Sequence, residues 1–295
     1  MANLKEIKRK IGSVKNTQKT TNAMKLVSSA KLKRTEELAK RSRVYAAKLT
    51  ELISEIAQKM QKNNAEGIDN VYFKENRNPK KVDIIFITAD KGLCGGFNAQ
   101  TIKRVNKLIS EYKAQDTKVR LRAIGRKGID YFRFNGIELN TEIVGLSAAP
   151  DYKTASEFIS EVADSYVNGE TDKIVLVHNG YVSMISQEIR EDQVLPVDSS
   201  KLQLNAVSTS ELEVEPDDDD TLLDALVKRY VEYTMYYSLI DSLAAEHSAR
   251  MQAMDAATKN AKEMVKTLTV KYNKARQEAI TTELIEIISG MESMK

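Results

Sequence analysis

Proline and glycine are missing from long stretches at both ends of this chain. Neither residue occurs between positions 13 and 66 or between positions 221 and 289, and all four prolines, Pro79, Pro150, Pro196 and Pro216, lie between these stretches. Proline and glycine are the two residues that most disfavour a helix interior. The sequence therefore predicts two long terminal helices around a central domain.

Cysteine and long apolar runs are scarce as well. Cys94 is the only cysteine, which excludes an internal disulfide and a cysteine-based zinc site and suits a reducing cytoplasm. No window approaches eighteen consecutive apolar residues, so we expect no membrane-spanning segment and membrane contact only through a partner. The N-terminus has no apolar signal core, so we expect the chain to stay in the compartment where it is made.

Helical periodicity fills both terminal stretches. In the C-terminal stretch, uncharged residues recur every three to four positions, which is typical of a coiled coil with a narrow seam. At about 1.5 Å per residue such a helix is roughly 100 Å long and needs a partner helix along its length. The seam residues are Leu223, Leu226, Tyr230, Tyr233, Tyr237, Ile240, Ala244, His247, Met251, Met254, Thr258, Ala261, Val265, Leu268, Tyr272 and Ala275.

The N-terminal stretch supplies a partner for that helix. Its apolar residues also follow helical spacing, at Leu4, Ile7, Ile11, Val14, Leu38, Tyr45, Leu49, Leu52 and Ile56. We therefore expect a coiled coil made of residues 1–66 and 217–295, with a central domain at residues 67–216.

The central region alternates between short apolar runs and helical patterns. We expect strands at residues 82–88, 119–124, 137–144 and 173–178, helices at 99–112, 127–134 and 154–168, and an antiparallel edge strand at 181–190 entered through Asn179-Gly180. Alternation of strands and helices is the pattern of a mostly parallel sheet with crossover helices. The fold class is therefore α/β, with a Rossmann-like central domain between the helices of a coiled coil.

Candidate chemical sites are few. The loop Lys91–Asn98, KGLCGGFN, follows the first expected strand, but its glycine spacing matches neither phosphate-binding motif, so we interpret it as a tight turn. We expect Cys94 to be unreactive, because the two histidines, His178 and His247, are better explained as packed side chains. The acidic run at residues 217–220 lacks the spacing of a calcium loop. We expect no catalytic centre, no cofactor and no metal.

Charge is distributed unevenly. Residues 1–43 contain thirteen Lys or Arg against Glu6, Glu36 and Glu37, although the net charge of the whole chain is only +3. A basic helix can be a solvated surface, can bind nucleic acid through phosphate contacts, or can attract an acidic protein partner. Charge alone leaves these three interpretations open.

Four segments resemble the γ-subunit family of F-type ATP synthases. They are IKRKIGSVKNTQKTTNAMKLVSSAKLKR (residues 7–34), ITADKGLCGGFN (87–98), AEHSARMQAMDAATKNA (245–261) and YNKARQEAITTELIEIISG (272–290). The resemblance implies a rotor shaft, in which the terminal helices form an antiparallel coiled coil inside a hexamer of α and β subunits. It also implies that the central domain lies beside the ε subunit and the membrane ring of c subunits, on the cytoplasmic face of a bacterial plasma membrane.

The resemblance also implies roles for individual residues. Positions that match the family's contacts to the α and β subunits are Met24, Lys25, Arg250, Arg276, Gln277, Thr281 and Glu283, and Glu215 and Pro216 match a Glu-Pro pair near the c ring and ε. The apolar residues Leu284, Ile287 and Ile288 would turn within an apolar collar of the hexamer. Departures from the family pattern occur at Ala89, at Leu212 and Val214, and at Met291.

Two other functions remain as alternatives. A coiled-coil nucleic-acid-binding protein would bind DNA or RNA in a salt-sensitive manner. A nucleotide-binding α/β enzyme with a helical arm would bind ATP or NAD by itself, but the glycine spacing in residues 91–98 disfavours it. The resemblance instead favours a non-catalytic subunit that couples ion flow to ATP synthesis or hydrolysis by rotation.

Overall fold

The computed structural model describes residues 2–63, 70–74, 76, 78–197 and 219–294. The chain divides into two compact units, one formed by Met1–Ser29 with Arg250–Lys295 and the other by Ala30–Ala249. The two terminal helices, α1 (Ala2–Asn63) and α5 (Asp219–Glu292), contribute to both units.

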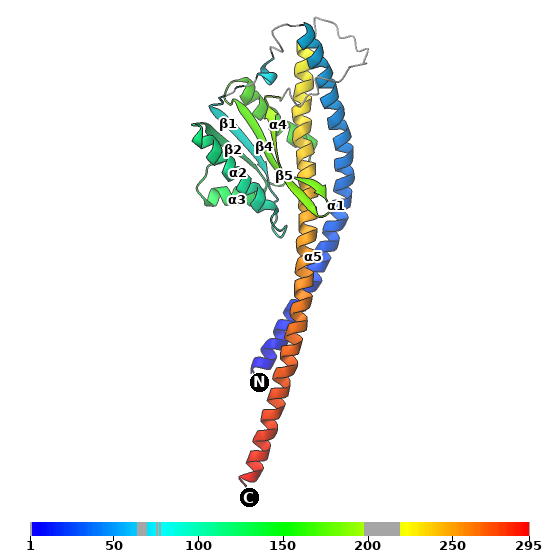
Figure 1. Ribbon diagram of the computed structural model, residues 1–295, viewed down its shortest axis with the longest axis vertical. Coiled ribbons are helices and arrows are strands. Elements are labelled where there is room, and N and C mark those ends of the chain that lie inside the picture. Colours follow the sequence, from blue (N-terminus) through cyan, green and yellow to red (C-terminus); the bar gives the residue numbers. More distant parts are fainter. Residues whose placement is uncertain (1, 64–69, 75, 77, 198–218, 295) are drawn as a thin grey trace. The chain divides into compact units, whose positions relative to one another are not determined.

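A five-stranded sheet organises the unit Ala30–Ala249. Its strands are β1 (Lys81–Ile87), β2 (Lys118–Ile124), β3 (Thr141–Ile143), β4 (Lys173–Ser183) and β5 (Ser186–Leu195), in the order β3-β2-β1-β4-β5 (Figure 1). β1 pairs in parallel with β2 and β4, and β2 with β3, whereas β5 is antiparallel to β4. This order, with crossover helices on both faces, confirms the predicted Rossmann-like domain.

Helices cover both faces of this sheet. Alternate residues of β1 point to opposite faces, so Ile84 and Phe86 pack beneath α2 (Phe97–Ala114) and α3 (Arg126–Phe134). Ile85 and Ile87 pack on the other face, against α4 (Tyr152–Val167) and α5. A short 3₁₀ helix, η1 (Val71–Phe73), lies at the edge of this second core through Tyr72.

α5 buries two stripes in this unit, whereas the sequence predicted one. All the predicted seam residues from Leu223 to His247 are buried or half-buried. A second stripe, spaced by four, packs against the sheet and α4; its members are Leu223, Val227, Val231, Met235 and Leu239. α5 lies between the sheet and α1, which is why a single narrow seam cannot describe residues 223–249 (Figure 1).

α1 follows a regular heptad, but not the one predicted for its second half. Positions that alternate by three and four from Leu4 to Ile53 are all buried or half-buried. Leu38, Tyr45 and Leu52, predicted as seam residues, are instead exposed, and the side chain of Ile56 is outside the described residues. The true seam was missed because small and polar residues occupy it, among them Ser28, Thr35, Ala39 and Ser42.

Most of the predicted central elements are confirmed, with two corrections. β3 covers only residues 141–143 of the strand predicted at 137–144. The edge strand predicted at 181–190 instead spans the turn of a hairpin, because β4 continues to Ser183 and β5 begins at Ser186. The predicted entry at Asn179-Gly180 therefore lies inside β4.

In the other unit, α1 and α5 form an antiparallel coil. The Oγ1 atoms of Thr21 and Thr258 are 2.7 Å apart, and Lys25 Nζ lies 2.6 Å from Asp255 Oδ1. As residue numbers rise on α1, the numbers of their partners fall on α5, which establishes the antiparallel direction. Polar pairs thus occupy the middle of a seam that also contains half-buried apolar residues such as Ile7, Ile11 and Leu268.

Candidate partner-binding surfaces

The end of α5 is one candidate surface. Every residue from Ile280 to Met294 is exposed, although this segment contains several large apolar side chains: Ile280, Leu284, Ile285, Ile287, Ile288, Met291 and Met294. An exposed apolar surface of this extent is typical of a protein interaction site. Four predicted partner-binding residues, Arg276, Gln277, Thr281 and Glu283, are exposed on this segment or on the turn before it.

A second exposed apolar group lies on α1. Met24, Leu26 and Val27 have exposed fractions of 40%, 61% and 57%, so all three point away from the coil seam. Met24 therefore does not fill the seam, and its contact with the β subunits stays a prediction. Every Lys and Arg of residues 1–43 except Lys25 is exposed as well, so the exposed surface of this part of α1 combines apolar and cationic side chains.

Lys25 differs from Met24 because it belongs to the seam. Its ammonium pairs with Asp255, which also accepts from Lys259 Nζ at 2.7 Å. The hydrogen bond from Lys25, followed by that from Lys259, lowers the pKa of Asp255 to about 2. Arg250 lies on the same helix, half-buried, five residues before Asp255. The structure thus brings the N-terminal and C-terminal predicted segments together through Lys25 rather than through Met24.

Two predicted residues cannot be placed. Glu215 and Pro216 lie outside the described residues, as do the side chains of Asp217 to Asp220. Across the parts of the chain that are described, no cluster of three His, Cys, Asp or Glu side chains could hold a metal ion. None of the described helices is long and apolar enough to cross a membrane.

The glycine-rich loop after β1 is packed against α5. Leu93 and Gly95 have positive φ angles of 64° and 59°, as expected for a tight turn. Cys94 is 1% exposed and packs with Phe97 at the start of α2 and with Ala245 and Ala249 of α5. In open α/β sheets, ligands bind at the carboxyl ends of the strands where the strand order reverses. Here small side chains of α5 occupy the region beside that loop.

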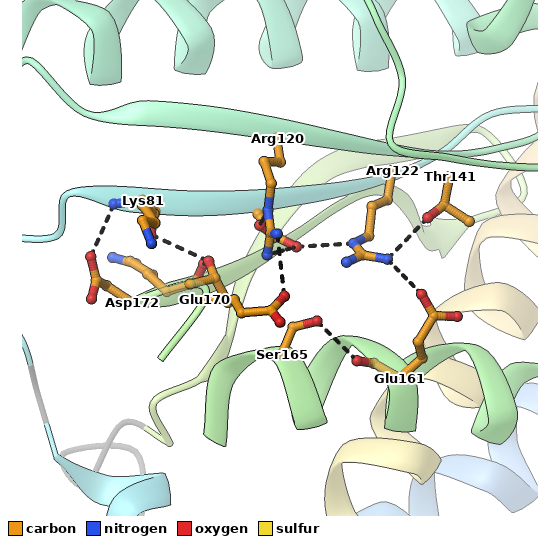
Figure 2. A network of polar contacts seen from close by, with 11 residues as sticks. Lys81, Arg120, Arg122, Thr141, Glu161, Ser165, Glu170 and Asp172 are labelled. Atoms are coloured by element: carbon orange, nitrogen blue, oxygen red, sulfur yellow. Dashed lines mark hydrogen bonds and ion pairs between the residues drawn. The ribbon is translucent and has the colours of Figure 1, made fainter. Parts of the chain in front are cut away.

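A buried ionic cluster on the sheet escaped the sequence analysis. Asp83 of β1 is fully buried and accepts hydrogen bonds from Arg120 Nε at 2.6 Å and Arg122 Nε at 2.9 Å (Figure 2). Arg122 Nη1 also donates to Thr141 Oγ1 at 3.0 Å and Glu161 Oε1 at 3.3 Å. The alternation of charged and apolar residues in Lys118–Ile124 was the available signal, since it places Arg120 and Arg122 on one face of β2. The cluster joins three strands to α4, and its groups satisfy one another.

Both histidines are packed, as predicted. His178 of β4 is 1% exposed and its Nε2 lies 3.2 Å from Asp241 Oδ2 of α5. His247 is 8% exposed on α5. The His178 ring is therefore oriented by a carboxylate of α5, and its Nε2 is directed to Asp241 and not to the thiol of Cys94.

Comparison with known proteins gives one consistent family. A family model described as ATP synthase matches residues 3–294. The chain is 84% identical to the ATP synthase gamma chain of Sulfurovum sp. (strain NBC37-1) and 60% identical to that of a Nitratiruptor species, in each case over the full length of both chains.

Solved structures agree with these relatives. The fold is similar to a chain of the central stalk and c-ring structure of the Tetrahymena thermophila mitochondrial ATP synthase, with 25% identity and a TM-score of 0.61 over 81% of this chain and 99% of that one. A chain of the Euglena gracilis mitochondrial ATP synthase gives a TM-score of 0.67 at 17% identity, over 99% of this chain and 95% of that one.

Proposed function

The chain belongs to the gamma-chain family of F-type ATP synthases, and we propose that it acts as the central rotor shaft of such an enzyme. In this role it couples ion flow through the membrane c ring to ATP synthesis or hydrolysis by rotation, with α and β subunits around the shaft and the ε subunit and c ring beside the central domain. The family assignment leaves the alternative of a nucleic-acid-binding protein without support.

One observation carries the proposal. The antiparallel coil of α1 and α5 ends in a segment of α5, Ile280–Met294, whose apolar side chains are all exposed in the chain alone. Such a segment is suited to a surrounding apolar sleeve of partner subunits, since burial of exposed apolar surface is what drives most protein association. An apolar sleeve would also let the helix turn, because apolar contacts have little directional preference.

Residue roles follow from exposure and charge. We propose that Met24, with Leu26 and Val27, faces the moving part of the β subunits, and that Arg276, Gln277, Thr281 and Glu283 form hydrogen bonds to the hexamer near the end of the shaft. Lys25 acts within the shaft, through Asp255, and Arg250 lies at the same level of α5. Glu215 and Pro216 are proposed to contact the c ring and ε.

The chain is proposed to be non-catalytic by itself. Phosphoryl transfer requires a phosphate cradle, a metal site and a group that positions the nucleophile. The glycines of the loop after β1 have the wrong spacing for a phosphate cradle. Cys94 and Phe97, in and after this loop, pack against alanines of α5. ATP hydrolysis is therefore proposed to occur on partner subunits, with the complex held at the cytoplasmic face of a bacterial plasma membrane.

The test is purification of the chain with its partners. Affinity purification of the tagged full-length chain from detergent-solubilised membranes should co-purify α, β and ε subunits and an ATPase activity, whereas the chain purified alone should hydrolyse no ATP. ATP turnover by the chain alone, or capture of nucleic acid without these subunits, would contradict the proposal.

A further inference from the structure

The hairpin of β4 and β5 is attached to α5 by a buried carboxylate. Asp241 of α5 is 3% exposed, and its Oδ2 accepts from Arg190 Nη1 of β5 at 2.7 Å. The same oxygen lies 3.2 Å from His178 Nε2, and Oδ1 accepts from the backbone N–H of Tyr181 at 3.2 Å. One side chain of α5 therefore holds both strands of the hairpin.

Two turns further along α5, Ser248 makes a second attachment. Its hydroxyl donates to the carbonyl oxygen of Met184 at 2.9 Å, and Gln187 Nε2 donates to the Ser248 oxygen at 2.7 Å. Met184 lies in the turn of the hairpin and Gln187 in β5. We call these groups around Asp241 and Ser248 the hairpin contact.

Gly180 is required by this arrangement. A Cβ atom added at Gly180 would lie 2.2 Å from Nε of Arg190 and 2.6 Å from its Cζ. The arginine side chain therefore crosses directly over the glycine on its way to Asp241. Because Gly180 has no side chain, β4 leaves room for the guanidinium of Arg190. This packing requirement explains the glycine, which the sequence analysis interpreted as the entry to a strand.

The hairpin contact joins α5 directly to the strands through polar groups. Other hydrogen bonds of α5 in this unit go to α4 and to the segment before β1: Tyr152 donates to Glu232 at 2.7 Å, and Asn70 donates to Asp224 at 2.7 Å. From Leu223 to Leu239 the helix faces the sheet with apolar side chains, which resist separation but have little directional preference. Hydrogen bonds to charged groups depend steeply on distance and angle, so they resist sliding and twisting as well. Ala245 and Ala249 of α5 belong to a small apolar cluster against which Tyr181 of β4 packs.

The position of the contact along α5 is also informative. Asp241 and Ser248 lie on the last three turns of α5 that belong to the unit containing the sheet, which ends at Ala249. These turns offer a route by which a twist applied to the sheet can pass into α5. This is where directional bonds would be most useful to a rotor.

We propose that Asp241 and Ser248 are positioning residues that transmit torque between the β4–β5 hairpin and α5. The proposal rests on the rotor function proposed above. Their role is mechanical: they keep the sheet and the helix from twisting against each other under load, and they contact no substrate.

The test compares three variants of the full chain in the assembled complex. Asp241→Asn keeps the size of the side chain and an oxygen for Tyr181 but loses the charge that holds Arg190, and Ser248→Ala removes the second attachment; the third variant carries both changes. Glu188→Gln is the control, because Glu188 also pairs with Arg190, at 3.1 Å, but does so from within β5 with a side chain that is 57% exposed.

Three quantities are measured: ATP hydrolysis, ions pumped per ATP in membrane vesicles, and the thermal angular fluctuation of a probe on the central domain while the coil is held. We expect the double variant to hydrolyse ATP at close to the wild-type rate, to pump about twofold fewer ions per ATP against a gradient, and to show a wider angular distribution. Glu188→Gln should match the wild type in all three.

Unchanged pumping and unchanged angular width in the double variant would overturn the proposal. If the double variant fails to assemble, Ser248→Ala alone decides by the same two readouts, since it removes only one hydroxyl. A wild-type complex that hydrolyses ATP without pumping would instead contradict the rotor function, so the two failures are distinguishable.

Discussion

The buried charges around Asp83 form a group whose members satisfy one another. Asp83 accepts from two arginines, and Arg122, only 2% exposed, donates to groups on β3 and α4 as well. Removing one member of such a group is costly, because it leaves another charge buried without its partner. The carboxylate at the centre of the cluster is therefore the most sensitive position.

We expect Asp83→Asn to lower the free energy of unfolding by about 3–5 kcal/mol, because both arginines lose their buried counter-charge. Denaturant unfolding of the isolated chain measures this. Glu170→Gln is the matched control: Glu170 is an exposed carboxylate 3.7 Å from Arg120, and its loss should change stability by less than about 1 kcal/mol. Equal effects of the two substitutions would contradict the assignment.

A pH dependence follows from Asp255. Its pKa is lowered to about 2 in the folded chain by the bonds from Lys25 and Lys259. Because the folded value lies below the unfolded one, the stabilisation is fully present above the unfolded pKa and is lost as the pH falls from about 4 towards 2. Thermal midpoints of the wild type and Asp255→Asn should differ at pH 6 and converge over that window. A difference that persists undiminished at pH 2 would refute the ion pair.

Met24→Lys probes the proposed contact with the β subunits. The side chain is exposed in the chain alone, so folding should be unaffected. In the complex an added ammonium that meets a β carboxylate at about 4 Å would gain up to roughly 4 kcal/mol before desolvation, and would deepen some rotary positions more than others. We expect ATP hydrolysis with poor ion pumping and a higher activation energy. Met24→Leu, the control, should behave as wild type; normal pumping in Met24→Lys would reject the contact.

At the scale of elements, α5 shows what periodicity can and cannot reveal. The predicted seam facing α1 is confirmed because tyrosines and alanines recur there at heptad spacing. The second stripe was missed because a helix that is buried on two sides has no single apolar face. On α1, apolar residues predicted the wrong face of the helix. Leu38 and Leu52 are apolar but exposed, and the seam continues through the buried polar residues Thr35 and Ser42.

The sheet was easier to predict than the hairpin at its edge. β1, β2 and the start of β4 are short segments rich in buried aliphatic residues and bounded by turn signals, and their positions are confirmed within a residue. The hairpin turn carries Met184 and Ile185, which give no turn signal, while Gly180 imitates one for a packing reason. The partner-binding residues came from resemblance alone, since exposure does not show in composition.

Deleting the residues after Gln277 tests the role of the α5 end as an element. Every residue from Ile280 to Met294 is exposed, so the deletion should leave the thermal midpoint of the chain close to wild type. In the complex we expect weaker coupling of hydrolysis to pumping, because the apolar contacts to the hexamer are lost. Wild-type pumping per ATP in the truncated complex would show that Thr281, Glu283 and the apolar end are dispensable.

At the scale of the whole molecule, one chain combines an α/β domain with a coil whose helices avoid flexible residues. Gly12 is the only glycine or proline of α1, and α5 has only Gly290. Each glycine in a helix interior costs about 1 kcal/mol relative to alanine, so their scarcity removes weak points at which a twisted helix could melt. The architecture suits a part that carries torque between partners.

Direct observation of rotation tests the central claim. Cys94 is buried, so Lys107→Cys, at a side chain that is 69% exposed on α2, gives one reactive thiol for a probe on the central domain. With the hexamer of α and β subunits fixed to a surface, we expect the probe to turn stepwise in one direction when ATP is added and to stop when ATP is removed. ATP hydrolysis at the normal rate with a probe that does not turn would contradict the account.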